Sequence, residues 1–177
     1  MNCFRAATGP QRARQLPLSR ALTLLVADGR GGFRTSQVPL RTGEPWFVCI
    51  GDVNGDRKPD LVVTHHELHE LTVLLGEGEG HFNEVAASAF DLGHNAFQLA
   101  LADVNHDGRI DVIAAAGDGL EVLLGDGEGT FKQAPGSPFL TVKGAWGFAL
   151  GDVNGDGKID LVTSSAENNT FSVLLGS

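Results

Sequence analysis

The sequence predicts an all-β fold built from repeated four-stranded antiparallel units, on three observations. An Asp-rich string, GDVNGDGKIDLV at 151–162, has two close relatives, GDVNGDRKPDLV at 51–62 and ADVNHDGRIDVI at 102–113. A second string, LTVLLGEGEGHF at 71–82, recurs as LEVLLGDGEGTF at 120–131, as LTLLVADGRGGF at 22–33 and, truncated, as FSVLLGS at 171–177. The two strings alternate with a period of about 50 residues, a length typical of repeat architectures.

Within each period, local patterns predict four strands in turn. The segments 46–52, 97–103 and 146–152 carry bulky residues at alternate positions, which is typical of a strand packed on one face. A short β-branched or apolar run follows each Asp-rich string, and the VLLG segment supplies a third strand. The Gly-rich turns at 76–80 and 125–129 predict hairpins, so the next Phe opens a fourth strand. Four such strands are typical of one β-propeller blade.

The repeats predict a partial β-propeller of about three and a half blades. Closed propellers have about 4 to 8 blades, so we expect an arc of a larger ring. Its open ends would expose apolar faces and unpaired strands, which predicts self-association. The expected divisions are a disordered or truncated tail at 1–21, a partial blade at 22–43, full blades at 44–93 and 94–143, and an incomplete blade at 144–177.

Composition indicates a globular chain whose excess negative charge lies in the Asp-rich strings. A length of 177 residues and 42% apolar content fit one domain with a sizeable core. The net charge of −9 is matched by nine Asp residues in the three strings, which argues against nucleic acid as a ligand. No stretch approaches the roughly 20 apolar residues of a membrane span, and we expect no signal peptide. Cys3 and Cys49 are too few to indicate a disulfide framework.

The Asp-rich strings predict cation sites. We call residues 52–60, 103–111 and 152–160 the first, second and third Asp loops and number each loop 1 to 9. Side chains at positions 1, 3, 5 and 9, with the carbonyl of position 7, can surround one point with oxygen. An all-oxygen set with three carboxylates suits Ca²⁺, which takes about 6 to 8 oxygens. Without a cation, such close carboxylates would repel and raise one another's pKa.

The Asp loops differ from three other kinds of Asp-rich segment. A single stretch rich in Asp, Asn and Gly is commonly an Asx turn without a ligand, but three copies in register argue against it. An EF-hand needs flanking helices and a Glu twelve positions in, where Val63, Ala114 and Thr163 stand on predicted strands. A dockerin begins with a similar half-loop, but its helix is absent from the predicted elements.

The pattern D-x-N-x-D-G-x-x-D, followed by apolar residues and then VLLGDGxGxF, resembles the FG-GAP/VCBS-type repeat, related to the Ca²⁺-binding blades of integrin α-subunit propellers. The resemblance covers 22–177 and implies that each Asp loop joins the first and second strands of a blade. It implies up to three Ca²⁺ ions, with Lys58, Arg109 and Lys158 acting through their carbonyls. The remaining implied ligands are Asp52, Asn54, Asp56, Asp60, Asp103, Asn105, Asp107, Asp111, Asp152, Asn154, Asp156 and Asp160.

The same resemblance implies a non-catalytic module for recognition or adhesion, extracellular or at the cell surface, whose partner is an unidentified protein or glycan. The alternative is an accessory or lectin-like part of a secreted carbohydrate-active enzyme. Sugar binding usually uses exposed aromatic residues, and the chain has no Tyr and only two Trp, which disfavours this alternative.

Segments that resemble enzyme motifs do not match the full motif patterns. The segment HHELHE at 65–70 resembles a zinc-protease motif, but Glu67 is one position too late for the pair His65 and His69, and the segment is predicted to be a turn. The glycines of GEGEGHF lie between two strands instead of opening a helix, so they do not form a dinucleotide site. No Gly-x-Ser-x-Gly elbow occurs, and we expect no enzymatic activity.

Two Asp loops depart from the pattern. Arg57 replaces Gly at position 6 of the first loop, where a positive φ would cost about 1 kcal/mol, and Pro59 restricts Lys58. His106 replaces Gly at position 4 of the second loop, and we expect a smaller cost there because position 4 should face solvent. The expected order of Ca²⁺ affinity is therefore third, second, first.

Overall fold

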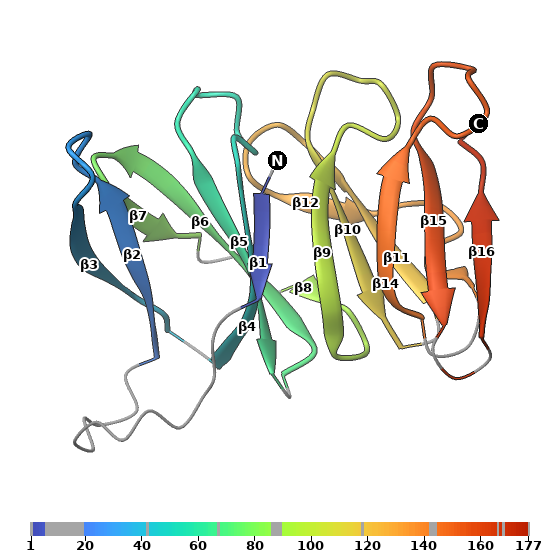
Figure 1. Ribbon diagram of the computed structural model, residues 1–177, viewed down its shortest axis with the longest axis horizontal. Helices are drawn as coiled ribbons and strands as arrows, with labels where there is room; N and C mark the ends of the chain where they lie inside the picture. Colours follow the sequence, from blue (N-terminus) through green and yellow to red (C-terminus); the bar gives the residue numbers. More distant parts are fainter. Residues whose placement is uncertain are drawn as a thin grey trace.

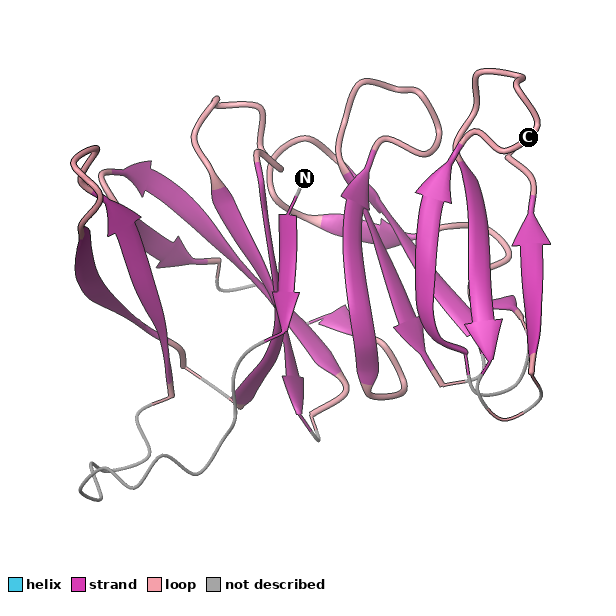
Figure 2. Cartoon of the chain, in the orientation of Figure 1, coloured by secondary structure: helices cyan, strands magenta, loops and turns pink. Residues whose placement is uncertain are grey.

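Every regular element is a strand in the part of the chain that the computed structural model describes (Figure 2). The described residues are 2–5, 20–41, 43–66, 68–85, 90–117, 119–141, 145–165, 167 and 169–176. No helix within these segments has the length and apolarity needed to cross a membrane. The prediction of an all-β fold is confirmed.

The strands form four antiparallel sheets in chain order. The N-terminal sheet contains β2 (Ala21–Ala27) and β3 (Phe33–Pro39). The first blade contains β4 (Glu44–Gly51), β5 (Asp60–His66), β6 (Glu70–Gly78) and β7 (His81–Glu84). The second blade contains β9 (Ala96–Ala102), β10 (Asp111–Ala116), β11 (Gly119–Gly125) and β12 (Phe131–Gln133). The C-terminal sheet contains β14 (Ala145–Gly151), β15 (Asp160–Ser165) and β16 (Thr170–Leu174).

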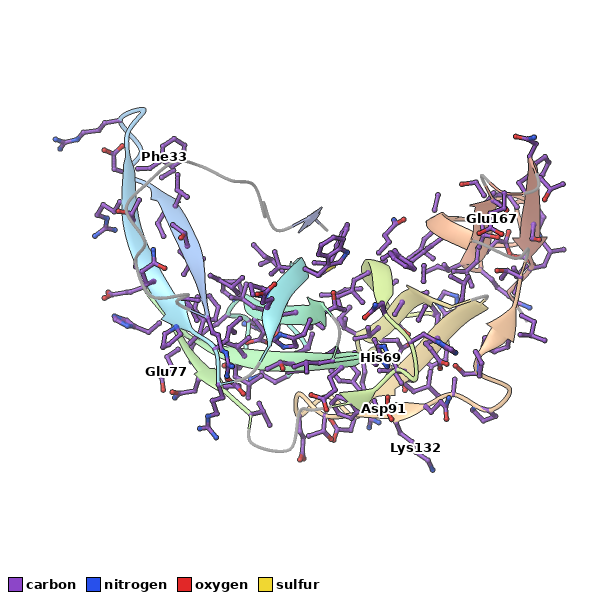
Figure 3. The ribbon with its side chains drawn as sticks, turned by 90° about the horizontal axis from the view of Figure 1, so that it is seen from below. Phe33, His69, Glu77, Asp91, Lys132 and Glu167 are labelled. Carbon is purple, nitrogen blue, oxygen red and sulfur yellow. The ribbon has the colours of Figure 1, made fainter. Side chains whose placement is uncertain are left out.

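The four sheets stand side by side in an open arc (Figure 1). Figure 3 shows the N-terminal sheet, with Phe33, at one end of the arc and the C-terminal sheet, with Glu167, at the other. Consecutive strands of each sheet are neighbours, as in a propeller blade, and the sheets do not close into a ring. The prediction of a partial β-propeller is confirmed.

The outer strand of each complete blade is broken into two short pieces, which the sequence did not predict. β8 (Phe90–Asp91) pairs with β6 beyond the end of β7, and β13 (Phe139–Leu140) pairs with β11 beyond the end of β12. Between the pieces, the amide of Val85 still donates to the Val73 carbonyl, and that of Ala134 to Val122. These two bonds continue the pairing of β7 with β6 and of β12 with β11 by one residue.

A strand also lies within the segment that we expected to be a tail. β1 (Asn2–Arg5) pairs antiparallel with the free edge of β4 and sets Cys3 opposite Cys49. Cys49 is disulfide-bonded, a feature that the number of cysteines did not indicate. An unpaired strand edge leaves backbone donors and acceptors open, and β1 satisfies them for β4. The rest of the expected tail, 6–19, lies outside the described residues.

The core consists of three apolar layers, each between two neighbouring sheets. Val62 and Val73 of the first blade face Val112 and Leu123 of the second blade. The alternate residue Leu61 faces the N-terminal sheet instead. Successive side chains of a strand point to opposite faces, so a blade with neighbours on both sides must be apolar on both faces. This requirement explains the continuous apolar runs of β5 and β10.

Gln98 adds a polar link between the inner strands of the second blade and the C-terminal sheet. Its Nε2 donates to the Phe148 carbonyl at 2.9 Å, and its Oε1 accepts from the Phe148 amide at 2.9 Å. Gly147 provides the space, because a Cβ there would lie 3.2 Å from Gln98 Oε1. A side-chain amide thus pairs with a peptide group as a neighbouring strand would.

His65 makes the stability of the fold depend on pH. Its side chain is buried on β5, and Nε2 lies 2.8 Å from Thr72 Oγ1. Burial lowers the pKa of His65, and the opposing effect of Glu84 is smaller. Because the unfolded chain then binds the proton first, the free energy of unfolding should be constant above about pH 6.5 and fall below it.

We predict that His65→Gln weakens this decline between about pH 6.5 and 5, measured by urea unfolding at several pH values. His81→Gln, at an exposed histidine of β7, is the matched control and should leave the decline unchanged. An equal decline in wild type and His65→Gln would show that another group is responsible.

Candidate metal centres

The three Asp loops lie along one edge of the arc, where they connect β4 to β5, β9 to β10 and β14 to β15 (Figure 1). All fifteen residues that the sequence singled out are in these loops. Because each loop belongs to a different sheet, the residues form three separate groups of five. Any cation sites would therefore be one per sheet.

The position-9 aspartates are buried and anchor the loops through hydrogen bonds. Asp60, Asp111 and Asp160 each begin the second strand of their sheet and have 0% exposed surface. In the first loop, Oδ2 of Asp60 accepts from the position-2 amide of Val53 at 2.8 Å, and Oδ1 accepts from the amide of Gly76 at 2.7 Å. The second and third loops repeat both bonds at 2.8 to 2.9 Å. One carboxylate thus ties the loop to the third strand.

The glycine that closes each VLLG segment is required by this arrangement, and sequence analysis missed it. A Cβ at Gly76 would overlap the Pro59 carbonyl oxygen, and one at Gly125 would overlap that of Ile110. At Gly176 the corresponding gap is 2.6 Å, which is also too short. The recurrence of this glycine at the repeat period was the available signal.

The remaining loop oxygens are held by the loop's own amides. In the third loop, Asp152 accepts from the amides of Asp156 at 3.1 Å and Gly157 at 2.8 Å. Asn154 Oδ1 accepts from the Asp156 amide at 2.9 Å, and Asp156 Oδ1 accepts from the Lys158 amide at 2.9 Å. The corresponding bonds in the first and second loops have closely similar lengths. The loops are therefore built alike despite their sequence differences.

Positions 4 and 6 both have left-handed backbone, which corrects one sequence expectation. Arg57 at position 6 has φ of 66°, as expected, but His106 at position 4 has φ of 58°. In the third loop, Gly155 and Gly157 occupy the two positions with φ of 80° and 83°. His106 is exposed, but the left-handed backbone still brings its Cβ into an unfavourable steric contact, which costs free energy. The first and second loops thus each hold one strained residue.

The loop carboxylates differ in their electrostatic surroundings. Burial raises the pKa of Asp60 and of Asp111, and the carboxylates at positions 1 and 5 add to the rise. The two backbone amides that each carboxylate accepts from oppose it. By contrast, the amide of Lys58 lowers the pKa of Asp56, and the amide of Lys158 does so for Asp156. Negative charge is therefore unfavourable at buried Asp60 and Asp111 and favourable at exposed Asp56 and Asp156.

The donor set fits a hard cation in its chemistry, since every candidate side chain offers oxygen. Each oxygen of Asp60 accepts one of the two described hydrogen bonds, and a carboxylate has about four lone-pair sites, so acceptor capacity remains. Among the described residues, however, no group of three or more His, Cys, Asp or Glu is arranged to hold a metal. The Asp56 carboxylate instead lies 3.3 Å from Lys58 Nζ, and Asp156 accepts from Asn154 Nδ2 at 3.1 Å.

The zinc-protease-like segment does not form a site in the described region. His65 is buried on β5, whereas His69 is exposed in the turn before β6 with φ of 56°. Glu67 lies outside the described residues. The sequence predicted a turn over 65–70, but β5 extends through His66 and β6 begins at Glu70, so in the described residues no helix face aligns the two histidines.

We predict that Arg57→Gly and His106→Gly each raise the free energy of unfolding by up to about 1 kcal/mol, because each removes a Cβ from a left-handed position. Gly157→Ala, which introduces that Cβ into the third loop, should lower it by a similar amount. Urea unfolding in EDTA measures the effect without a cation. No change in Arg57→Gly and His106→Gly would contradict the strain argument.

We also predict that Asp111→Asn lowers the free energy of unfolding by about 1–3 kcal/mol, because its amide nitrogen cannot accept one of the two buried N–H bonds. Asp107→Asn is the matched control, since its exposed side chain keeps an oxygen for the Arg109 amide. Equal losses in the two variants would show that the buried bridge is not the cause.

Comparisons with known proteins agree with the repeat architecture. The family model of the FG-GAP-like repeat matches residues 52–114 and 103–163, which together span more than half of the chain. A solved structure of the Tc holotoxin pore of Photorhabdus luminescens superposes with a TM-score of 0.52 at 20% identity, over 88% of this chain and 8% of that chain. Curated proteins give no match. Each match begins at one Asp loop and ends in the strand that follows the next Asp loop, and the two matches overlap. They show that the chain belongs to the FG-GAP-like repeat family.

Proposed function

We propose that this chain is a Ca²⁺-binding, non-catalytic β-propeller module for extracellular recognition or adhesion. The observation that carries the proposal is the equivalence of the three Asp loops, which present the same oxygen donors at the same positions on one edge of the arc. Asx turns alone would not require a carboxylate at positions 1, 5 and 9 of all three loops.

In this proposal each ion is held by the side chains of positions 1, 3, 5 and 9 and by the position-7 carbonyl. The three loops contain nine carboxylates but only four cationic side chains, those of Arg57, Lys58, Arg109 and Lys158. Ca²⁺ would supply positive charge beside the buried carboxylates of Asp60 and Asp111, where neighbouring carboxylates oppose ionisation. The amides that already orient positions 1 and 9 would reduce the ordering cost of binding.

The recognition part of the proposal is supported by where the loops lie. Loops positioned by a rigid scaffold commonly carry binding residues, and the Asp loops repeat along one edge of stacked sheets. Their residues include no Ser, Thr or Cys nucleophile. The disulfide-bonded Cys49 supports an oxidising, extracellular location. A protein or glycan is the partner class that we propose.

We predict that Ca²⁺ raises the melting temperature clearly, whereas Mg²⁺ raises it weakly because it prefers strict octahedral geometry and retains water. Binding at a hundredfold excess over Kd stabilises by about 2.7 kcal/mol per site. Calorimetry should give up to three ions, with the third loop tightest. Asp156→Ala should remove that site, while Glu128→Ala, at an exposed acid outside the loops, should remove none.

Equal melting curves in Ca²⁺, Mg²⁺ and EDTA would overturn the metal proposal. Recognition is tested separately on protein and glycan arrays, with and without Ca²⁺. If the chain bound Ca²⁺ but no arrayed ligand, the metal site would stand and the proposed protein or glycan partner would be rejected.

A further inference from the structure

The outer face of the C-terminal sheet is apolar and exposed at positions that the two complete blades bury. Phe171 is 71% exposed, although the equivalent Leu71 and Leu120 are each 0% exposed. Val173 is 45% exposed, against 0% for Val73 and 4% for Val122. We call the face formed by Val153, Phe171, Val173 and Leu175 the leading face. It has the chemistry of a blade interface that is not covered.

The opposite end of the arc shows the complementary exposure. Leu25 is 60% exposed, while the equivalent Leu74 of the first blade is 1% exposed. Phe33 is 62% exposed, while the equivalent Phe131 of the second blade is 7% exposed. We call the face of the N-terminal sheet that carries Leu25 and Phe33 the trailing face. Leu22, whose position points the other way, is buried against the first blade.

Inside the chain, these two kinds of face meet each other. In the layer between the first and second blades, Val53, Leu71 and Val73 on one side pack with Leu123 and Phe131 on the other. The first group occupies leading-face positions, and the second occupies trailing-face positions. The layer before the C-terminal sheet repeats the arrangement, with Leu120 and Val122 on its leading side. The two exposed ends are therefore the two halves of an interface that the chain already makes.

We propose that a second copy of this chain binds head to tail, with the leading face of one copy on the trailing face of the other. Each copy contributes four sheets. Two copies would supply four complete blades and four incomplete sheets, eight stacked sheets in all, and closed propellers stack about 4 to 8 blades. A head-to-tail contact either closes into a ring or continues as a filament, and eight sheets favour closure by two copies. This assembly does not depend on Ca²⁺ in the loops.

The test uses the full chain in light scattering coupled to size exclusion, in EDTA and again in Ca²⁺. Wild type should have the mass of two copies. Phe171→Asp places a charge on the leading face, and Leu25→Asp places one on the trailing face. Each variant alone should therefore be monomeric. Mixed in equal amounts, they retain one intact leading face and one intact trailing face and should form a 1:1 dimer. Leu140→Asp, at a residue 81% exposed on β13 and outside both faces, should remain dimeric.

A monomeric wild type at high concentration would overturn the proposal, as would loss of dimer in Leu140→Asp. If Leu25→Asp alone stayed dimeric, the contact would be leading face to leading face and head-to-tail binding would be rejected. Circular dichroism checks that each variant folds, and Val173→Lys with Phe33→Arg provides a second pair. Dimerisation in EDTA would support this assembly even if Ca²⁺ failed to bind.

Discussion

The buried position-9 carboxylate is the interaction on which each repeat depends. The carboxylate accepts one hydrogen bond from an amide of its own loop and another from the amide of the glycine that closes the VLLG segment. This holds for Asp60, Asp111 and Asp160. A carboxylate without these donors would be costly to bury, and buried amides without an acceptor would be costly as well. The bridge therefore fixes the loop, the start of the second strand and the end of the third strand together.

The same bridge also aims a side chain at the neighbouring sheet. The amide that it holds belongs to position 2, and Val53 at that position is 2% exposed in the layer between the two blades. Val104 packs in the next layer. A loop at the edge of the arc is thereby coupled to the apolar contact between sheets. Any change of charge or ligation in an Asp loop therefore acts close to the apolar contact between neighbouring sheets.

Local features of the sequence were sufficient for the strand order, the hairpins and the Asp loops, because period, alternation and turn residues determine them. Positive φ at Arg57 also followed from its position in the loop pattern. Features that depend on contacts distant in sequence were missed. The need for Gly76 arises from the carbonyl of Pro59, and the pairing of β1 arises from the free edge of β4. His106 was misjudged because exposure was considered and backbone angle was not.

The nearest-neighbour packing of the sheets has a consequence for how the molecule opens and how it can evolve. In the described part of the chain, each apolar layer lies between neighbouring sheets, so stability should behave as a one-dimensional array of units and interfaces. Amide protons of β10 and β11, in a blade covered on both faces, are then the last to exchange with solvent, and fraying begins at the ends of the arc. Duplication or deletion of one whole repeat would lengthen or shorten the stack while every surviving interface kept its form.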